Sequence, residues 1–284
     1  MTPTRRSFTT TDGLTLVGDA WGDASHAPVL LMHGGGQTRH AWGGTARALA
    51  ARGWHAVAVD LRGHGDSQWA ADGNYGLETF ARDLAAVART FARPPVLVGA
   101  SLSGLGGLIA QGEAAAPLFA ALVLVDVTPR LDAQGTQNII GFMRHRLDEG
   151  FATLEEAADS IAAYNPHRPR PKEISGLAKN LRQRDGRYYW HWDPAFMTGT
   201  RPPDIHQHHE RLFAAARALR IPTLLVRGRM SELVTMEAAQ EFLAFAPHAK
   251  FVDVSGAGHM VAGDRNDAFT EAVAEFLAER AAEA

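Results

Sequence analysis

Short runs of apolar residues alternate with helical patterns along most of the chain. The first two runs, at residues 7–10 and 14–21, are joined by Thr-Asp-Gly, which is typical of a hairpin turn. The later runs are continuously apolar, as in parallel strands that are buried on both faces. These later runs lie at residues 28–32, 55–60, 95–100, 121–126, 223–228 and 249–254.

The segments between the runs have helical periodicity. From Leu77 to Phe91, apolar residues recur at three- and four-residue spacing and form a single stripe, and residues 268–277 repeat this pattern. Strands that alternate with helices indicate βαβ units. We therefore predict an α/β fold with a doubly wound sheet.

The alternation stops between about Thr128 and Arg220, where no strand is predicted. This part contains the helical stretches 154–164 and 209–219 and the aromatic cluster Tyr-Tyr-Trp-His-Trp-Asp-Pro-Ala-Phe at 188–196. We interpret residues 128–220 as a helical cap that covers the carboxyl edge of the sheet. Residues 1–127 and 221–284 then form the core domain.

The run at 95–100 leads into a serine motif, Gly-Ala-Ser-Leu-Ser-Gly. Gly99, Ser101 and Ser103 match the order small residue, any, nucleophile, any, small residue, which permits a sharp turn from strand to helix. Such a turn presents the Ser101 hydroxyl at the edge where α/β proteins bind ligands, and the N–H of Leu102 faces the same space. Serine is also common as a helix N-cap, so the motif by itself leaves both roles open.

Two glycine-rich segments supply candidate partners for Ser101. His-Gly-Gly-Gly follows the run at 28–32, and we expect the N–H of Gly35 to join that of Leu102 in an oxyanion hole. His259 lies in the loop between the last strand and the last helix. A serine hydroxyl needs a base, and this loop can hold an imidazole over the sheet edge.

Two acids are candidates for orienting His259. Glu232 follows the strand 223–228 and gives the chain order serine, acid, histidine, so it is the first choice. Asp126 ends the strand 121–126 and is the alternative, although it can also cap the turn into the insertion.

The loop Asp-Leu-Arg-Gly-His-Gly-Asp-Ser at 60–67 is rich in charged groups. Asp60, Arg62, His64 and Asp66 invite a catalytic interpretation. Because two glycines make the loop tight, we expect these side chains to hydrogen-bond its backbone, with a supporting role near the cleft.

Composition excludes several classes of function. The net charge of −3 over 284 residues disfavours a nucleic-acid or an anionic membrane partner, and the absence of cysteine excludes thiolate nucleophiles and disulfides. No metal site or cofactor is indicated. The N-terminus lacks the apolar segment of a secretory signal, and no apolar stretch is long enough to span a bilayer. We expect a cytoplasmic monomer or homodimer that acts on a small molecule.

Together, these motifs resemble those of the α/β-hydrolase superfamily. The segments HGGG, DLRGHGDS, GASLSG, RGRMSELV and GAGHMVAGDRNDAF follow one another in the family's order. The resemblance implies an eight-stranded, mostly parallel sheet with an antiparallel second strand and a helical cap after the sixth strand. It also implies that Ser101 is the nucleophile and His259 the base. Many members carry the acid three residues after the glycine that ends the seventh strand; Ser231 occupies that position here.

The predicted function is that of a serine hydrolase similar to esterases, lactonases and cofactor-free haloperoxidases. It would cleave a carboxylic ester or lactone through an acyl-enzyme, with a Ser-His-Glu triad. The alternatives are a C–C bond hydrolase of a dienoate, an acyltransferase or perhydrolase, and a non-catalytic member that binds a small ligand. Ser101 argues against epoxide hydrolases and haloalkane dehalogenases, which use aspartate there. The predicted substrate-binding residues are His33, Gly36, Trp190, Trp192 and Phe196.

Overall fold

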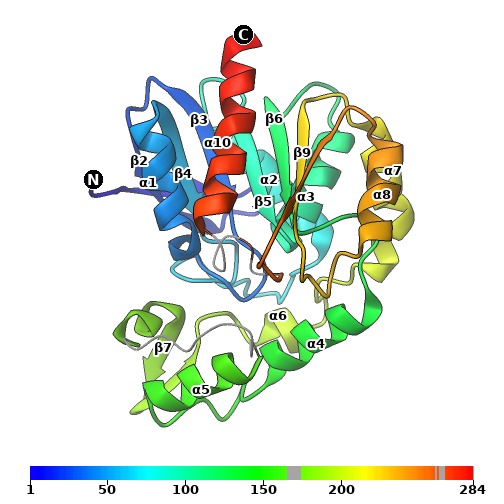
Figure 1. The fold of residues 1–284 in the computed structure, drawn as a ribbon. Coiled ribbons are helices and arrows are strands. Elements are labelled where there is room, and N and C mark those ends of the chain that lie inside the picture. The colour runs from blue at the N-terminus through cyan, green and yellow to red at the C-terminus, as the bar shows by residue number, and fades with distance from the viewer. Residues whose placement is uncertain (165–173, 260, 262–265, 284) are drawn as a thin grey trace.

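A single eight-stranded sheet forms the centre of the molecule (Figure 1). The computed structural model describes residues 1–164, 174–259, 261 and 266–283. The strand order is β1-β2-β4-β3-β5-β6-β9-β10; β2 is antiparallel to both of its neighbours, and the other pairs are parallel. The prediction of an eight-stranded, mostly parallel sheet is therefore confirmed. The strands are β1 (Thr4–Thr9), β2 (Thr15–Trp21), β3 (Ala27–Met32), β4 (Trp54–Val59), β5 (Val96–Ala100), β6 (Ala121–Val125), β9 (Thr223–Gly228) and β10 (Lys250–Val254).

Helices cover both faces of this sheet, which explains the continuously apolar strands. In β3, Val29 and Leu31 pack into the core beneath one helical layer, whereas Leu30 and Met32 pack beneath the other. The first layer contains α1 (Gly43–Ala51) and α10 (Asn266–Glu283). The second contains α2 (Leu77–Ala88), α3 (Leu102–Gly112), α7 (His209–Ala218) and α8 (Met236–Phe245). Among the described residues, no helix is both long and apolar enough to cross a membrane.

A cap of short elements between β6 and α7 lies across one edge of the sheet (Figure 1). It consists of α4 (Ala133–Arg144), α5 (Leu154–Tyr164), η2 (Ser175–Asn180), β7 (Leu181–Arg184), β8 (Arg187–Trp190) and α6 (Ala195–Thr198). The 3-10 turns η1 (Arg39–Trp42) and η3 (His206–His208) lie before α1 and α7. Although α7 falls within the predicted insertion, it packs against α3 and α8 beside the sheet.

The prediction that residues 128–220 contain no strand is wrong. β7 and β8 form an antiparallel hairpin that pairs Leu181 with Trp190. Its turn is Asp185-Gly186, and both residues have positive φ, 51° and 74°. Asp-Gly with positive φ at both positions is a strong hairpin signal, so the local sequence did encode this element. The Pro- and Arg-rich part of the insertion at 165–173 lies outside the described residues.

The contact between α3 and α7 brings two backbones together. A Cβ added to Gly112 at the end of α3 would lie 2.6 Å from both Cα and Cβ of Ala215 and 2.8 Å from its carbonyl oxygen. Backbone atoms cannot rotate away as a flexible side chain can. Glycine at this position therefore allows α7 to pack directly on α3.

We predict that Gly112→Ala lowers the free energy of unfolding by about 1–3 kcal/mol, the usual cost of overpacking, despite the higher helix propensity of alanine. The matched control is Gly141→Ala in α4, where an added Cβ meets nothing within 4 Å. That change is expected to raise the stability by up to about 1 kcal/mol. Urea denaturation of both variants tests this, and equal effects would contradict the close-packing argument.

Candidate active site

Ser101 lies at a strained turn between β5 and α3. Its backbone has φ 48° and ψ −116°, a combination that non-glycine residues rarely adopt. The turn depends on a close crossing of Gly99 and Gly104: a Cβ on Gly99 would lie 2.9 Å from Gly104 Cα, and a Cβ on Gly104 would lie 2.8 Å from Gly99 O. The side chain of Ser101 makes no N-cap hydrogen bond to α3, so the alternative capping role is not realised in the structure.

Ser103 has a different role from its neighbour. Its side chain is fully buried, and its hydroxyl donates toward Met32 O at 2.7 Å, with Ala100 O at 3.0 Å. The sequence motif required only a small residue here. The structure shows that this hydroxyl also connects the turn after β5 to the end of β3. The glycine loop, residues 34–36, begins just after that strand.

The partner of His259 is Asp126. His259 Nδ1 lies 2.7 Å from Asp126 Oδ2, and the fully buried carboxylate also accepts hydrogen bonds from Ser231 Oγ at 2.6 Å and Gly228 N–H at 2.9 Å. A carboxylate on Nδ1 holds the proton on that nitrogen and leaves Nε2 as the basic atom. This is the arrangement that a general base needs.

The prediction of Glu232 as the partner of His259 is therefore wrong. Glu232 is exposed and accepts a hydrogen bond from Asn138 Nδ2 of α4 at 2.9 Å. The loop after β9 turns at Ser231, whose hydroxyl accepts from the N–H groups of Leu233 and Val234 while it donates to Asp126. The available signal was Ser231 itself: a serine stands where many family members carry the acid, and an aspartate ends the preceding strand of the sheet.

Two backbone N–H groups beside Ser101 are suited to bind an oxyanion. Within the described part of the chain, the N–H groups of Gly35 and Leu102 have no protein acceptor, whereas that of Gly34 donates to Gln37 Oε1 at 3.1 Å. The positive end of the α3 dipole strengthens the Leu102 site. Free donors at a strand end, next to a serine, are the feature that stabilises charge developing on a carbonyl oxygen.

His33 orients one of these donors from behind the loop. It is fully buried; its Nδ1–H donates to Gly34 O at 2.7 Å, and its Nε2 accepts from Leu61 N–H at 3.0 Å. The C=O and N–H of a trans peptide point in opposite directions, so this bond turns the N–H of Gly35 away from His33. His33 does not line the cavity, and its prediction as a substrate-binding residue is wrong.

A cavity of about 1010 Å³ lies between the sheet edge and the cap. Ser101 and His259 both line it, and no hydrogen bond joins their side chains; such catalytic bonds commonly tighten only when substrate binds. Four of the predicted substrate-binding residues line the cavity: Gly36, Trp190, Trp192 and Phe196. Its apolar wall is extended by Leu131, Ile139, Phe142, Ile161, Leu177 and Met197.

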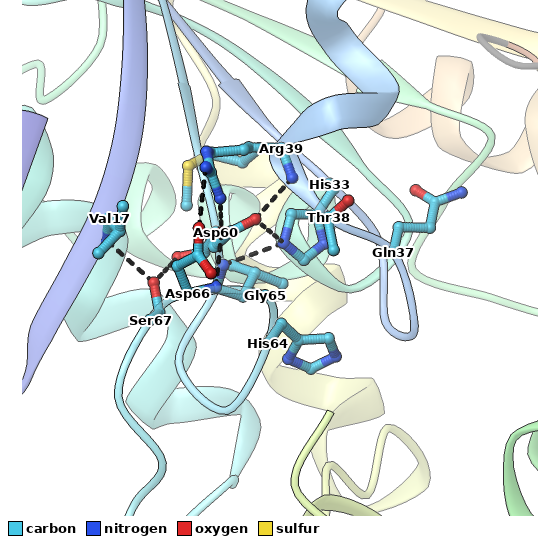
Figure 2. A network of polar contacts seen from close by, with 12 residues as sticks. Val17, His33, Gln37, Thr38, Arg39, Asp60, His64, Gly65, Asp66 and Ser67 are labelled. Atoms are coloured by element: carbon cyan, nitrogen blue, oxygen red, sulfur yellow. Dashed lines mark hydrogen bonds and ion pairs between the residues drawn. The ribbon is translucent and has the colours of Figure 1, made fainter. Parts of the chain in front are cut away.

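A buried ion pair anchors the glycine loop to the loop after β4 (Figure 2). Asp60 accepts hydrogen bonds from the N–H of Arg39 at 2.7 Å, from the Arg39 guanidinium and from the N–H of Asp66 at 3.0 Å. Arg39 also bonds Asp19 Oδ2 through Nε at 2.8 Å. As expected from the sequence, Asp60 and His64 of the 60–67 loop bind backbone groups. The expectation is wrong for Arg62, which pairs with Asp83 and Asp12, and for Asp66, which pairs with Arg5 and Arg39. None of these four side chains lines the cavity.

Comparison with known proteins places the chain in a family. The model of the alpha/beta hydrolase family matches residues 29–272, so the protein belongs to this family. Esterase Rv0045c of Mycobacterium tuberculosis is 34% identical over 265 residues, which cover 90% of this chain and 84% of that protein. The 3-hydroxybutyrate-oligomer hydrolase of Cupriavidus necator is 28% identical over 251 residues, 84% of this chain and 85% of its own length. These relatives identify the protein as a hydrolase.

Solved structures agree with this assignment. A solved structure of the M. tuberculosis esterase superposes with a TM-score of 0.75 at 30% identity, covering 98% of this chain and 92% of that chain. The structure of E-2-(acetamidomethylene)succinate hydrolase gives a TM-score of 0.80 at 24% identity, covering 97% and 99%, and supports the fold alone.

Three buried histidines behind the loop are predicted to make the protein sensitive to acid. Burial lowers the pKa of His33 to about 4, lowers that of His64 to about 3, and holds that of His191 well below its ordinary value of 6.5. In the unfolded chain these imidazoles bind protons below about pH 6.5. In the folded protein they bind protons only below their lowered pKa values. Their contribution to stability is thus complete above pH 6.5 and is lost as the pH falls toward the folded pKa values.

Between pH 6 and pH 4, His64→Gln is therefore expected to reduce the slope of the unfolding free energy against pH by up to about 1.4 kcal/mol per pH unit. Urea denaturation at a series of pH values measures this slope. The difference between wild type and variant is expected to be constant above pH 7. A slope unchanged by the substitution would contradict the assignment of His64 as a buried neutral group.

Proposed function

We propose that the protein is a serine hydrolase that cleaves carboxylic esters, including lactones, through an acyl-enzyme. Ser101 is the nucleophile, His259 the base and Asp126 the acid that orients it. The observation that carries this proposal is the 2.7 Å contact between His259 Nδ1 and the buried Asp126 carboxylate, at the same sheet edge as the strained Ser101 turn. The esterase activity named for the M. tuberculosis relative supports the choice of an ester bond.

The reaction follows from the arrangement of these groups. His259 Nε2 takes the proton of Ser101 as the hydroxyl oxygen attacks the ester carbonyl, and Asp126 stabilises the imidazolium that forms. The N–H groups of Gly35 and Leu102 bind the oxyanion. The C–O bond to the alcohol then breaks, and His259 donates its proton to the leaving oxygen. Water, deprotonated by His259, attacks the acyl-enzyme and releases the acid and free Ser101.

The cavity favours substrates with an apolar acyl or alcohol part. Phe196 of α6 lies directly over the glycine loop, with its Cζ 3.3 Å from where a Cβ on Gly35 would stand. Trp190 and Trp192 stack with ring centroids 4.9 Å apart and form part of the wall. A cavity of about 1010 Å³ with such walls accommodates groups much larger than acetyl.

Ser101→Ala is expected to abolish the hydrolysis of p-nitrophenyl esters and to leave the protein folded, because alanine removes the attacking oxygen. Wild type incubated with a panel of esters and lactones should gain the mass of an acyl group on Ser101, detected by intact-mass and peptide mass spectrometry. Ser103→Ala is the matched control and should still form the adduct. Full esterase activity in Ser101→Ala would overturn the proposal.

Three further assays on the wild-type protein separate the alternative functions. A C–C bond hydrolase would turn over a dienoate ring-fission product in preference to p-nitrophenyl esters. An acyltransferase or perhydrolase would form the adduct and pass the acyl group to an added alcohol or peroxide faster than to water. A non-catalytic binding protein would not react with a fluorophosphonate at Ser101.

The choice of acid is tested by a pair of isosteric variants. Asp126→Asn is expected to lower kcat by about 10³–10⁴-fold, because the amide no longer favours the required tautomer of His259 or stabilises its cation. Glu232→Gln removes the charge of an exposed side chain bound to Asn138 and should change kcat by less than about threefold. The reverse ranking, measured by steady-state kinetics, would restore Glu232 as the acid.

A further inference from the structure

We propose that His64 and His191 are positioning residues that clamp Gly36 from two sides and thereby hold the glycine loop 34–36 in the geometry that binds the oxyanion. The proposal rests on the function proposed above, because it assigns a role within that oxyanion hole. It makes the cap, through His191, a part of the apparatus that stabilises the transition state as well as a wall of the cavity.

The first half of the clamp comes from the loop after β4. His64 is fully buried; its Nδ1–H donates to Arg62 O at 2.9 Å, and its Nε2 accepts the N–H of Gly36 at 3.1 Å. The ring is therefore fixed by its own loop on one nitrogen and holds the glycine loop with the other. Figure 2 shows the imidazole of His64 below the loop that carries Gln37 and Thr38.

The second half comes from the cap. His191 follows β8 and is fully buried; its Nε2–H donates to Gly36 O at 3.2 Å, and its Nδ1 accepts the N–H of Gly65 at 2.9 Å. One ring thus joins three segments: the cap, the glycine loop and the loop that contains His64. Both backbone polar groups of Gly36 are occupied by imidazole nitrogens.

Gly36 is the residue of the loop for which such restraint matters. Its φ is +75°, and it follows two further glycines, so the free segment has wide conformational freedom. The N–H of Gly35 stabilises an oxyanion only if it is already aimed when charge develops. His33 fixes the peptide before Gly35, and the clamp fixes the peptide after it.

The rings can do this only in their neutral form. His64 and His191 each use one nitrogen as an acceptor for a backbone N–H, which a protonated ring cannot do. Their surroundings support this state: both rings are buried, and His64 packs edge-on against Phe196 with 4.7 Å between ring centroids. Burial lowers the pKa of both imidazoles.

Asparagine and glutamine variants separate the bonds to Gly36 from the other bonds. A glutamine amide reaches the position of Nε2, whereas an asparagine amide reaches only that of Nδ1. Because both histidines contact Gly36 through Nε2, His64→Gln and His191→Gln retain a polar group on Gly36. His64→Asn and His191→Asn retain only the bonds to Arg62 O and Gly65 N–H, respectively.

The experiment measures kcat and KM for a p-nitrophenyl ester together with Tm. We expect the Asn variants to lose about 10–100-fold in kcat with KM within about twofold, because only the transition state carries the oxyanion. The kcat of each Gln variant should be at least tenfold higher than that of the Asn variant at the same position. Equal kcat for the Asn and Gln variants, or a loss confined to KM, would overturn the clamp. If an Asn variant does not fold, His64→Met, which fills the site without a strong acceptor, replaces it in the comparison.

A fluorophosphonate assay on wild type distinguishes failure of the clamp from failure of the proposed function. If wild type is labelled at Ser101 and the Asn variants turn over as fast as wild type, only the clamp is wrong. If wild type is not labelled at Ser101, the proposed function is wrong, and the clamp is rejected with it.

Discussion

The geometry of the site depends on the hydrogen bonds that the buried carboxylate of Asp60 accepts. This carboxylate holds the N–H and the guanidinium of Arg39, just after the glycine loop, and the N–H of Asp66 in its own loop. The loop wraps so closely that a Cβ on Gly65 would lie 2.3 Å from Asp60 Oδ2. A buried charge is tolerable only when it is fully paired, so Arg39 and the two N–H groups must stay in place together. Through this group the loops after β3 and β4 behave as one unit.

Two neighbouring strands of the sheet each end in a residue with an unusual backbone conformation. Ser101 after β5 and Asp126 after β6 have φ of 48° and 49°, although neither is glycine. Each is held by the strand beside it: Ser101 N–H donates to Val125 O at 3.1 Å, and Asp126 N–H donates to Val226 O at 2.7 Å. Such conformations persist only where the surroundings over-determine them. The sheet thus places the proposed nucleophile and the proposed acid on adjacent, rigid positions.

The cap completes this arrangement from the opposite side. Its aromatic residues enclose the cavity, and Asp193 accepts a hydrogen bond from the hydroxyl of Tyr75 at 2.6 Å, while His191 bonds Gly36 and Gly65. These bonds are buried, where polar contacts are strong and an unpaired partner is costly. The cap therefore docks on the core through satisfied polar groups as well as through apolar packing.

The sequence by itself determined the strands of the central sheet, the helices that cover them, and the candidates Ser101 and His259. These depend on local chemistry: apolar runs, helical stripes, and small residues around a sharp turn. The tertiary structure decided which acid contacts His259. Asp126 and Glu232 follow neighbouring strands of the sheet, and only the path of the loop at Ser231 directs one to the imidazole and the other to α4. His33 was likewise predicted to bind substrate, but long-range packing buries it behind the glycine loop. Contacts between distant segments decide which groups meet at a site, and local sequence patterns do not specify those contacts.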